Sequence, residues 1–162
     1  VGPGGRREIA ATDFFLGPLE TTLAEDELVE AVRFTRFGPG TRTAFLESSR
    51  RHGDYALAGV AVAVDVADGV VVSARAGFVS VTPVPLVLDL TPVLGGRDAG
   101  APVPDEVTDA VREFVDPEGD IHATADYRRM LAAELTRRAL ATATHPTPAA
   151  DPAPTTAQES VA

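Results

Sequence analysis

The sequence contains neither cysteine nor lysine. The absence of cysteine excludes a structural disulfide, a thiolate metal site, a cysteine nucleophile and an iron–sulfur cluster held by this chain. All fourteen basic residues are arginine, which together with abundant alanine, valine, proline and glycine indicates a GC-rich coding bias more than a function. No apolar run reaches the length of a membrane span, and the first residues lack the charged-then-apolar order of a signal peptide.

The remaining composition is typical of a globular protein. Of the 162 residues, 44% are hydrophobic and 23% are charged, and the formal net charge is -10. This length allows one domain with an appendage. An acidic chain without a basic stripe is not expected to bind nucleic acid, and without a signal peptide we expect it to be cytoplasmic. Because the first residue is Val1 rather than methionine, we expect a fragment or a processed piece.

The most informative stretch covers residues 45–66 and ends in a long alternating pattern. Ala61, Ala63 and Asp65 share one face of this pattern, and valines occupy the other. These valines are Val60, Val62, Val64 and Val66. Alternation with a period of two, rich in valine, is typical of a β-strand. We expect a helix or a second sheet to pack closely on the small alanine face.

Three strands are expected, over residues 43–48, 56–66 and 70–81, because a tight turn of Ala67, Asp68 and Gly69 joins antiparallel neighbours. Apolar spacing predicts helices over 105–115 and from 124 or 125 to 141, whereas 86–94 is ambiguous between helix and strand. The predicted fold class is therefore α+β: a three-stranded antiparallel β-meander packed against about three helices. Four arginines of the last helix are expected largely off its apolar stripe, as helix stabilisers: Arg128, Arg129, Arg137 and Arg138.

Breaker residues divide the chain into three parts. The Phe37–Gly40 stretch, which contains a Gly-Pro-Gly run, marks the best internal boundary, so the parts are 1–37, 38–141 and 142–162. The last part is rich in proline, alanine and threonine and is predicted to be disordered. Within the first part, short strands are expected over 7–11 and 28–35, and Asp13 is expected to cap a short helical turn through its side chain.

A polar segment, residues 48–55, separates the first two strands and is called here the arginine loop. Gly53 can adopt a backbone conformation closed to other residues, so the chain can turn sharply there. The turn would place four chemically useful side chains at one end of the sheet: Arg50, Arg51, Asp54 and Tyr55. The residues alone leave two interpretations open. One is a solvated hairpin turn with an Arg–Asp pair, and the other is a binding site.

Independent catalytic chemistry is weakly supported. Ser48, Ser49 and His52 are neighbours, but the Gly-x-Ser-x-Gly pattern of a nucleophile elbow is absent. The three histidines are too scattered to predict a metal site. No catalytic residue and no metal ligand is therefore assigned, although a hydrolase using the Ser/His/Asp residues of the arginine loop is kept as a minor hypothesis.

Several linked motifs resemble one protein family. Residues 50–64, RRHGDYALAGVAVAV, look like the signature in the C-terminal domain of the FAD-binding (medium) subunit of carbon monoxide dehydrogenase and of xanthine dehydrogenase family molybdenum hydroxylases. Residues 7–17 and 21–29 are similar to the same subunit just before that domain, and residues 77–83 and 126–131 also fit. The resemblance covers roughly residues 6 to 141, in order and at plausible spacing.

The resemblance implies a role in electron transfer. Such subunits sit between an iron–sulfur small subunit with 2Fe–2S clusters and a molybdopterin large subunit, and they pass electrons from the clusters through FAD to an acceptor. The N-terminal FAD-binding domain, whose glycine-rich loops hold most of the FAD, is not contained in this sequence. Residues 1–37 would then close that domain, and 38–141 would form the C-terminal domain that covers the flavin. By position, the resemblance makes Asp13, Arg50, Arg51, Asp54 and Tyr55 candidates for FAD contact.

An alternative hypothesis is a non-catalytic binding or dimerisation module that lacks its flavin-holding half. The coding sequence upstream distinguishes the two hypotheses. A glycine-rich flavin lobe in the same reading frame supports the flavin subunit, and an independent start codon near Val1 supports the module.

Overall fold

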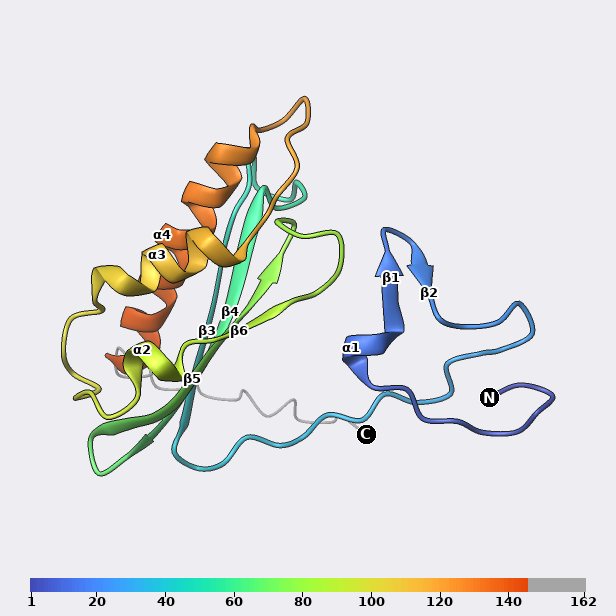
Figure 1. Cartoon of the computed structure of the whole chain (residues 1–162), viewed down its shortest axis with the longest axis horizontal. Coiled ribbons are helices and arrows are strands. Elements are labelled where there is room, and N and C mark those ends of the chain that lie inside the picture. The colour runs from blue at the N-terminus through green and yellow to red at the C-terminus, as the bar shows by residue number, and fades with distance from the viewer. Residues whose placement is uncertain (146–162) are drawn as a thin grey trace, which may run out of the picture.

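The computed structural model describes residues 1–145 of the chain. Residues 41–145 form one antiparallel sheet with helices on one face, and residues 1–40 form a more open segment on the other side (Figure 1). The expected disordered tail is corrected at its start, because the last helix continues to Thr144 rather than ending at 141. The rest of that tail, 146–162, lies outside the described residues.

The sheet contains β3 (Thr41–Ser48), β4 (Ala58–Ala67), β5 (Val70–Val79) and β6 (Val87–Asp89), in that spatial order. Neighbouring strands are antiparallel, which confirms the expected meander for the first three. The fourth strand corrects the prediction of a three-stranded sheet. β6 pairs with β5 through only three residues, too few to produce a recognisable alternation in the sequence.

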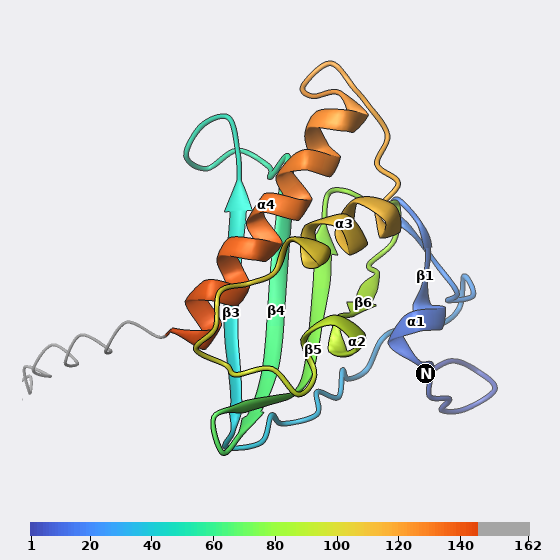
Figure 2. The ribbon, with the colours of Figure 1, turned by 60° about the vertical axis from the view of Figure 1, so that its left-hand side comes forward.

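The helices follow the predicted pattern. The ambiguous 86–94 stretch contains both structures that its sequence allowed, β6 and then the short helix α2 (Thr91–Leu94). Helices α3 (Asp105–Phe114) and α4 (Ala125–Thr144) lie where apolar spacing placed them. α4 crosses β3 and β4, α3 packs on α4, and α2 packs on β5 (Figure 2).

The core lies between the valine face of β4 and the helices. Val60, Val62 and Val64 are buried there, each burial contributing about 1.5–3 kcal/mol. On the helix side, Ala132 and Ala139 of α4 are fully buried, and their small side chains let α4 approach the sheet closely. The valine face of the predicted alternation is therefore the core face of β4.

Among residues 1–145, neither a helix nor a second sheet packs closely on the alanine face of β4, although its small residues led us to expect one. Ala61 is exposed, and so are Phe45 of β3 and Val87 of β6 beside it. In the part of the chain that the structure describes, the helices all lie on the valine side of the sheet, except for α1 in the N-terminal segment (Figure 1). This open face is a correction to the expected close packing.

Residues 1–40, called here the N-terminal segment, contain α1 (Ala11–Phe14) and a small hairpin of β1 (Phe15–Gly17) and β2 (Glu20–Thr21). The strands expected over 7–11 and 28–35 do not form, because neither stretch pairs with a strand in the described part of the chain. Side-chain ion pairs join residues 6–8 to residues 27–33 instead: Arg6–Glu30, Arg7–Glu27 and Arg33–Glu8.

The expected cap of the short helix is also corrected. The residue at the N-cap of α1 is Ala10, which makes no side-chain cap, and Asp13 lies inside the helix. Its carboxylate accepts a hydrogen bond from the Thr12 hydroxyl at 3.2 Å. Asp13 is therefore a residue within this four-residue helix and not its cap.

Candidate functional site

Three loops at one end of the molecule enclose a cleft of about 1040 Å³. They are the arginine loop before β4, the turn after β5 around Ser80, and the loop before α4 around Asp120. Pro18, from the hairpin of the N-terminal segment, also lines the cleft. A cleft of this size is in the range that holds small molecules and cofactors.

The backbone organises the arginine loop. Gly53 has a φ of 89°, the left-handed conformation that the sequence predicted there. The amide of Asp54 donates to the carbonyl of Arg51 at 3.1 Å, and the amide of Leu57 closes the base by donating to the carbonyl of Ser48 at 2.7 Å. Because these hydrogen bonds join backbone atoms, the side chains of the loop remain available to face the cleft.

Four of the five candidate FAD-contacting residues line this cleft: Arg50, Arg51, Asp54 and Tyr55. All four are exposed, and Tyr55 is 99% exposed. Asp13 lies on α1 and does not line the cleft. The structure thus brings together the part of the predicted site that the arginine loop carries.

The expected Arg–Asp pair within the loop is not formed. Within residues 1–145, Asp54 makes no ion pair, whereas a guanidinium nitrogen of Arg50 lies 3.4 Å from Nδ1 of His122. That contact joins the arginine loop to the loop before α4. The hydroxyl of Ser49 donates to the carbonyl of Arg51 at 2.9 Å rather than to His52, which gives no support to the hydrolase hypothesis.

Sequence reasoning missed two residues of the cleft, Arg128 and Asp120. Arg128 is only 7% exposed, and its guanidinium donates to the carbonyl of Leu57 at 2.6 Å and to that of Ser80 at 3.2 Å. It also donates to the carboxylate of Asp120 at 2.7 Å. The expectation that Arg128 lies off the buried stripe of the last helix is therefore wrong.

Asp120 joins this arrangement from the loop before α4. Its carboxylate accepts hydrogen bonds from the amides of Ala123 and His122 as well as from Arg128. These contacts, the two amides first, lower the pKa of Asp120 to about 2. Asp120 therefore carries a negative charge at neutral pH and partly balances the arginine beside it.

Two signals in the sequence point to Arg128. It stands four residues before Ala132 and seven before Leu135, both buried on the core face of α4. It also lies in the first turn of the helix, where a positive charge opposes the helix dipole. A basic residue at that end, on that face, indicates a specific acidic partner such as Asp120.

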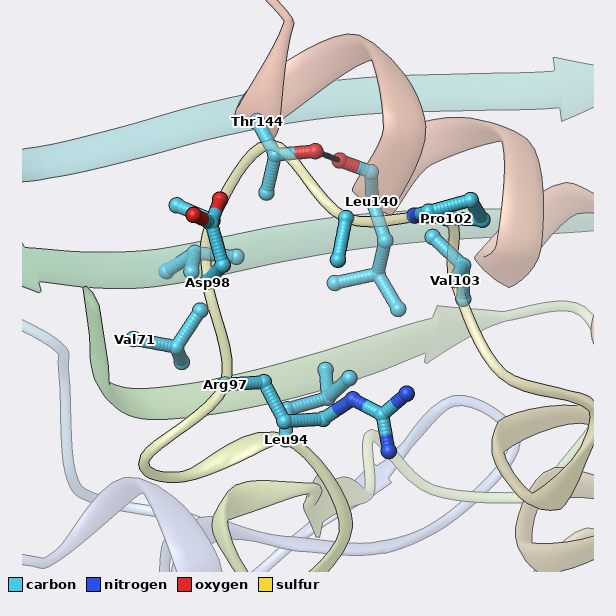
Figure 3. Close-up of a pocket in the computed structure, with 11 residues that line it drawn as sticks. Val71, Leu94, Arg97, Asp98, Pro102, Val103, Leu140 and Thr144 are labelled. Carbon is cyan, nitrogen blue, oxygen red and sulfur yellow. Dashed lines mark hydrogen bonds between the residues drawn. The ribbon is translucent and has the colours of Figure 1, made fainter. Parts of the chain in front are cut away.

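A second, much smaller cavity of about 20 Å³ lies between the sheet, α4 and the loop after α2 (Figure 3). Its walls are largely apolar, with Val71, Leu94 and Leu140 among them. The volume corresponds to about one water molecule, so this cavity cannot take a cofactor.

Two further findings concern function classes. Among residues 1–145, no group of three or more histidine, cysteine, aspartate or glutamate side chains is placed to hold a metal ion. Over the same range, each helix is too short or too polar to cross a lipid bilayer.

The family model for the CO dehydrogenase flavoprotein C-terminal domain matches residues 43–143. The carbon monoxide dehydrogenase medium chain of Hydrogenophaga pseudoflava is 33% identical over 145 residues, which is 86% of this chain and 49% of that protein. The nicotine 6-hydroxylase medium subunit of Paenarthrobacter nicotinovorans is 35% identical, over 84% of this chain and 48% of that protein.

Solved structures show the same relationship. The carbon monoxide dehydrogenase of Hydrogenophaga pseudoflava that lacks the Mo-pyranopterin moiety superposes with a TM-score of 0.77 at 33% identity, over 88% of this chain and 50% of that one. The quinoline 2-oxidoreductase of Pseudomonas putida 86 gives a TM-score of 0.69 at 27% identity, with the same two shares. This chain therefore spans about half the length of the relatives it matches. The family resemblance read from the arginine loop is confirmed: the chain belongs to the CO dehydrogenase flavoprotein C-terminal domain family, and its homologues are medium (FAD) subunits of molybdenum hydroxylases.

Proposed function

We propose that this chain is the C-terminal part of the flavin subunit of a molybdenum-containing hydroxylase or dehydrogenase. In this proposal residues 1–37 complete an FAD-binding domain, and the following domain covers the FAD and supports electron transfer from iron–sulfur clusters to an acceptor. The observation that carries the proposal is the convergence of Arg50, Arg51, Asp54 and Tyr55 on one cleft. That cleft is bordered by Pro18 of the N-terminal segment, which would belong to the flavin-holding side.

The residues present fit one side of a flavin. The ring of Tyr55 is free to pack against a flat aromatic group, and the cleft is large enough to take part of a dinucleotide. The pyrophosphate would be held elsewhere, because this sequence has no glycine-rich phosphate loop between a strand and a helix.

Each proposed side chain has a distinct role. FAD, when bound, supplies the redox chemistry, and the chain supplies position and charge. Arg50 and Arg51 place positive charge at the mouth of the cleft, where it would balance negative charge on a flavin or a phosphate. Asp54, with no ion-pair partner among the described residues, is free to accept a hydrogen bond from the ligand or to orient an arginine. Tyr55 contributes apolar contact.

The proposed partners are an iron–sulfur small subunit, a molybdopterin large subunit and the FAD-binding domain that precedes this chain. The relatives named carbon monoxide dehydrogenase medium chain support this assignment, since a medium chain implies companion chains. The molybdenum cofactor and the 2Fe–2S clusters would belong to those partners. This agrees with a chain that contains no cysteine.

The test is FAD retention in the complete subunit, expressed with its companion subunits. Arg50→Ala and Asp54→Ala are expected to lower the FAD bound per protein, measured by flavin absorbance after gel filtration, and the double variant to lower it about ten-fold. Arg112→Ala is the control, because Arg112 is an exposed arginine of α3 that does not line the cleft. Unchanged FAD content and unchanged flavin reduction in the double variant would show that the arginine loop is structural only.

The open face of the sheet favours a second candidate, a binding or dimerisation module. Phe45, Val79 and Val87 are exposed on β3, β5 and β6, and exposed apolar surface often marks an interface. Analytical ultracentrifugation of the 162-residue chain alone tests this. A stable dimer that Val87→Glu dissociates would favour the module, whereas a monomer that binds a separately expressed FAD-binding domain would favour the flavin subunit.

A further inference from the structure

We propose that Arg128 is the positioning residue of the cleft: its guanidinium holds all three loops that form the cleft walls in one arrangement. This inference rests on the proposed function and concerns how the site is kept ready for a flavin. Its partners belong to three separate loops. Leu57 follows the arginine loop, Ser80 follows β5, and Asp120 lies in the loop before α4.

The two carbonyls need such a donor because the sheet ends before them. Pairing between β4 and β5 begins at Gly59 with Val79, so Leu57 and Ser80 lie just beyond the last paired residues. Ser80 has a φ of 62°, a left-handed conformation that favours glycine. The hydrogen bond from Arg128 stabilises this turn and fixes the direction of the chain as it leaves β5.

The shape of the arginine side chain is essential to this role. A guanidinium presents five donors in a rigid planar fork, and here its two terminal nitrogens reach three acceptors on different segments. A lysine ammonium is a single point charge and cannot span them. The Nε atom of Arg128 is buried without a hydrogen-bond partner in the described part of the chain, and burying an unpaired donor costs free energy. Packing alone does not explain why the side chain is held there at this cost.

The arrangement links Arg128 directly to the arginine loop. Leu57 donates its amide to Ser48 and gives its carbonyl to Arg128, so it connects the base of the loop to α4. Asp120 accepts a hydrogen bond from the amide of His122, and the ring of His122 contacts Arg50 of the arginine loop. Movement of Arg128 would therefore displace both ends of the loop that carries Tyr55.

The neighbouring residue Arg129 provides a matched control. It also contacts a backbone carbonyl, that of Val115, and two carboxylates, those of Asp116 and Asp126, but none of these residues lines the cleft. Val111→Ala provides a second control, because Val111 is fully buried on α3 and its truncation lowers stability without changing the cleft.

The experiment measures the FAD dissociation constant and the melting temperature of the complete flavin subunit in its complex, using free FAD as the probe. We expect Arg128→Lys and Arg128→Met to raise the dissociation constant about ten-fold or more, and Asp120→Asn to raise it less, with higher fluorescence of the bound flavin as Tyr55 moves away. Arg129→Met and Val111→Ala are expected to stay within about two-fold of the wild type.

Two results would overturn the inference alone. In the first, Arg128→Lys binds FAD as the wild type does. In the second, Arg128→Lys and Val111→Ala weaken FAD binding equally at equal loss of melting temperature, which would make Arg128 a stability residue. If Arg128→Met does not assemble, the Arg128→Lys and Asp120→Asn variants decide the outcome. A wild-type complex that contains no flavin would instead overturn the proposed function, and the inference with it.

Discussion

The N-terminal segment and the domain of residues 41–145 are held together by different forces. None of residues 1–40 is buried, and the segment is organised by ion pairs and a few backbone hydrogen bonds. By contrast, the buried apolar residues among 1–145, apart from Leu57, form one core cluster within residues 58–143. The domain therefore carries its own hydrophobic driving force, whereas the segment has very little.

The apolar side chains of the N-terminal segment are nevertheless large. Leu19, Phe34 and Phe37 are exposed. Phe14 and Phe15 form an edge-to-face pair, in which Phe14 is half-buried and Phe15 is exposed. So many exposed large apolar residues in a short stretch are typical of a surface that packs against another protein part. The chain spans about half the length of the relatives it matches.

Core truncation should separate the two regions most strongly. Leu140 is 1% exposed in the core, so Leu140→Ala is expected to lower the free energy of unfolding by about 2–5 kcal/mol. Phe34 is 84% exposed in the N-terminal segment, and Phe34→Ala should change it by less than about 0.5 kcal/mol. Urea unfolding followed by circular dichroism checks both variants of the 162-residue chain. Equal losses would mean that the segment shares the core.

The same difference explains which elements could be predicted from the sequence. β4, α3 and α4 show periodicity because their buried faces repeat every second or every third to fourth residue. β6 is too short to repeat, and the strands expected over 7–11 and 28–35 have no strand partner among residues 1–145.

The candidate site divides in a similar way. The arginine loop could be located from Gly53 and from the family resemblance, because its chemistry is contiguous in sequence. The contact of Arg128 with Leu57 could not be predicted, since the two residues lie 71 positions apart and only the fold brings them together. The local signals for Arg128 itself were its place on the core face of α4 and its positive charge in the first turn of that helix.

Acid titration should show a smaller difference between the regions. The pKa of Asp120 is lowered to about 2 by two amides and Arg128, so its stabilising charge is present above about pH 4 and is lost as pH falls toward 2. Asp120→Asn should therefore lower the melting temperature at pH 6, and the difference from the wild type should vanish near pH 2. Thermal unfolding across this pH range measures it. A difference in melting temperature that persists at pH 2 would show that Asp120→Asn destabilises the domain for a reason other than the lost charge.

The smallest effect is expected for the equivalent carboxylate of the N-terminal segment. The pKa of Glu27 is also lowered to about 2, chiefly by its hydrogen bond with Arg7, so its contribution too is lost between about pH 4 and pH 2. Because none of the residues that it organises is buried, Glu27→Gln should leave the melting temperature unchanged at pH 6. It should instead speed amide exchange locally, at Ala24, whose amide donates to Glu27, and at Leu28, whose amide donates to Val1.

Hydrogen exchange read by mass spectrometry over residues 20–30, with Asp120→Asn as the comparison, tests this difference. The carboxylates of Asp120 and Glu27 have the same lowered pKa, of about 2. They differ in their surroundings, because Asp120 contacts the packed domain and Glu27 organises an exposed segment. If Glu27→Gln lowers the melting temperature as much as Asp120→Asn does, the N-terminal segment unfolds together with the domain. The division between a self-supporting domain and a segment without a core of its own would then be wrong.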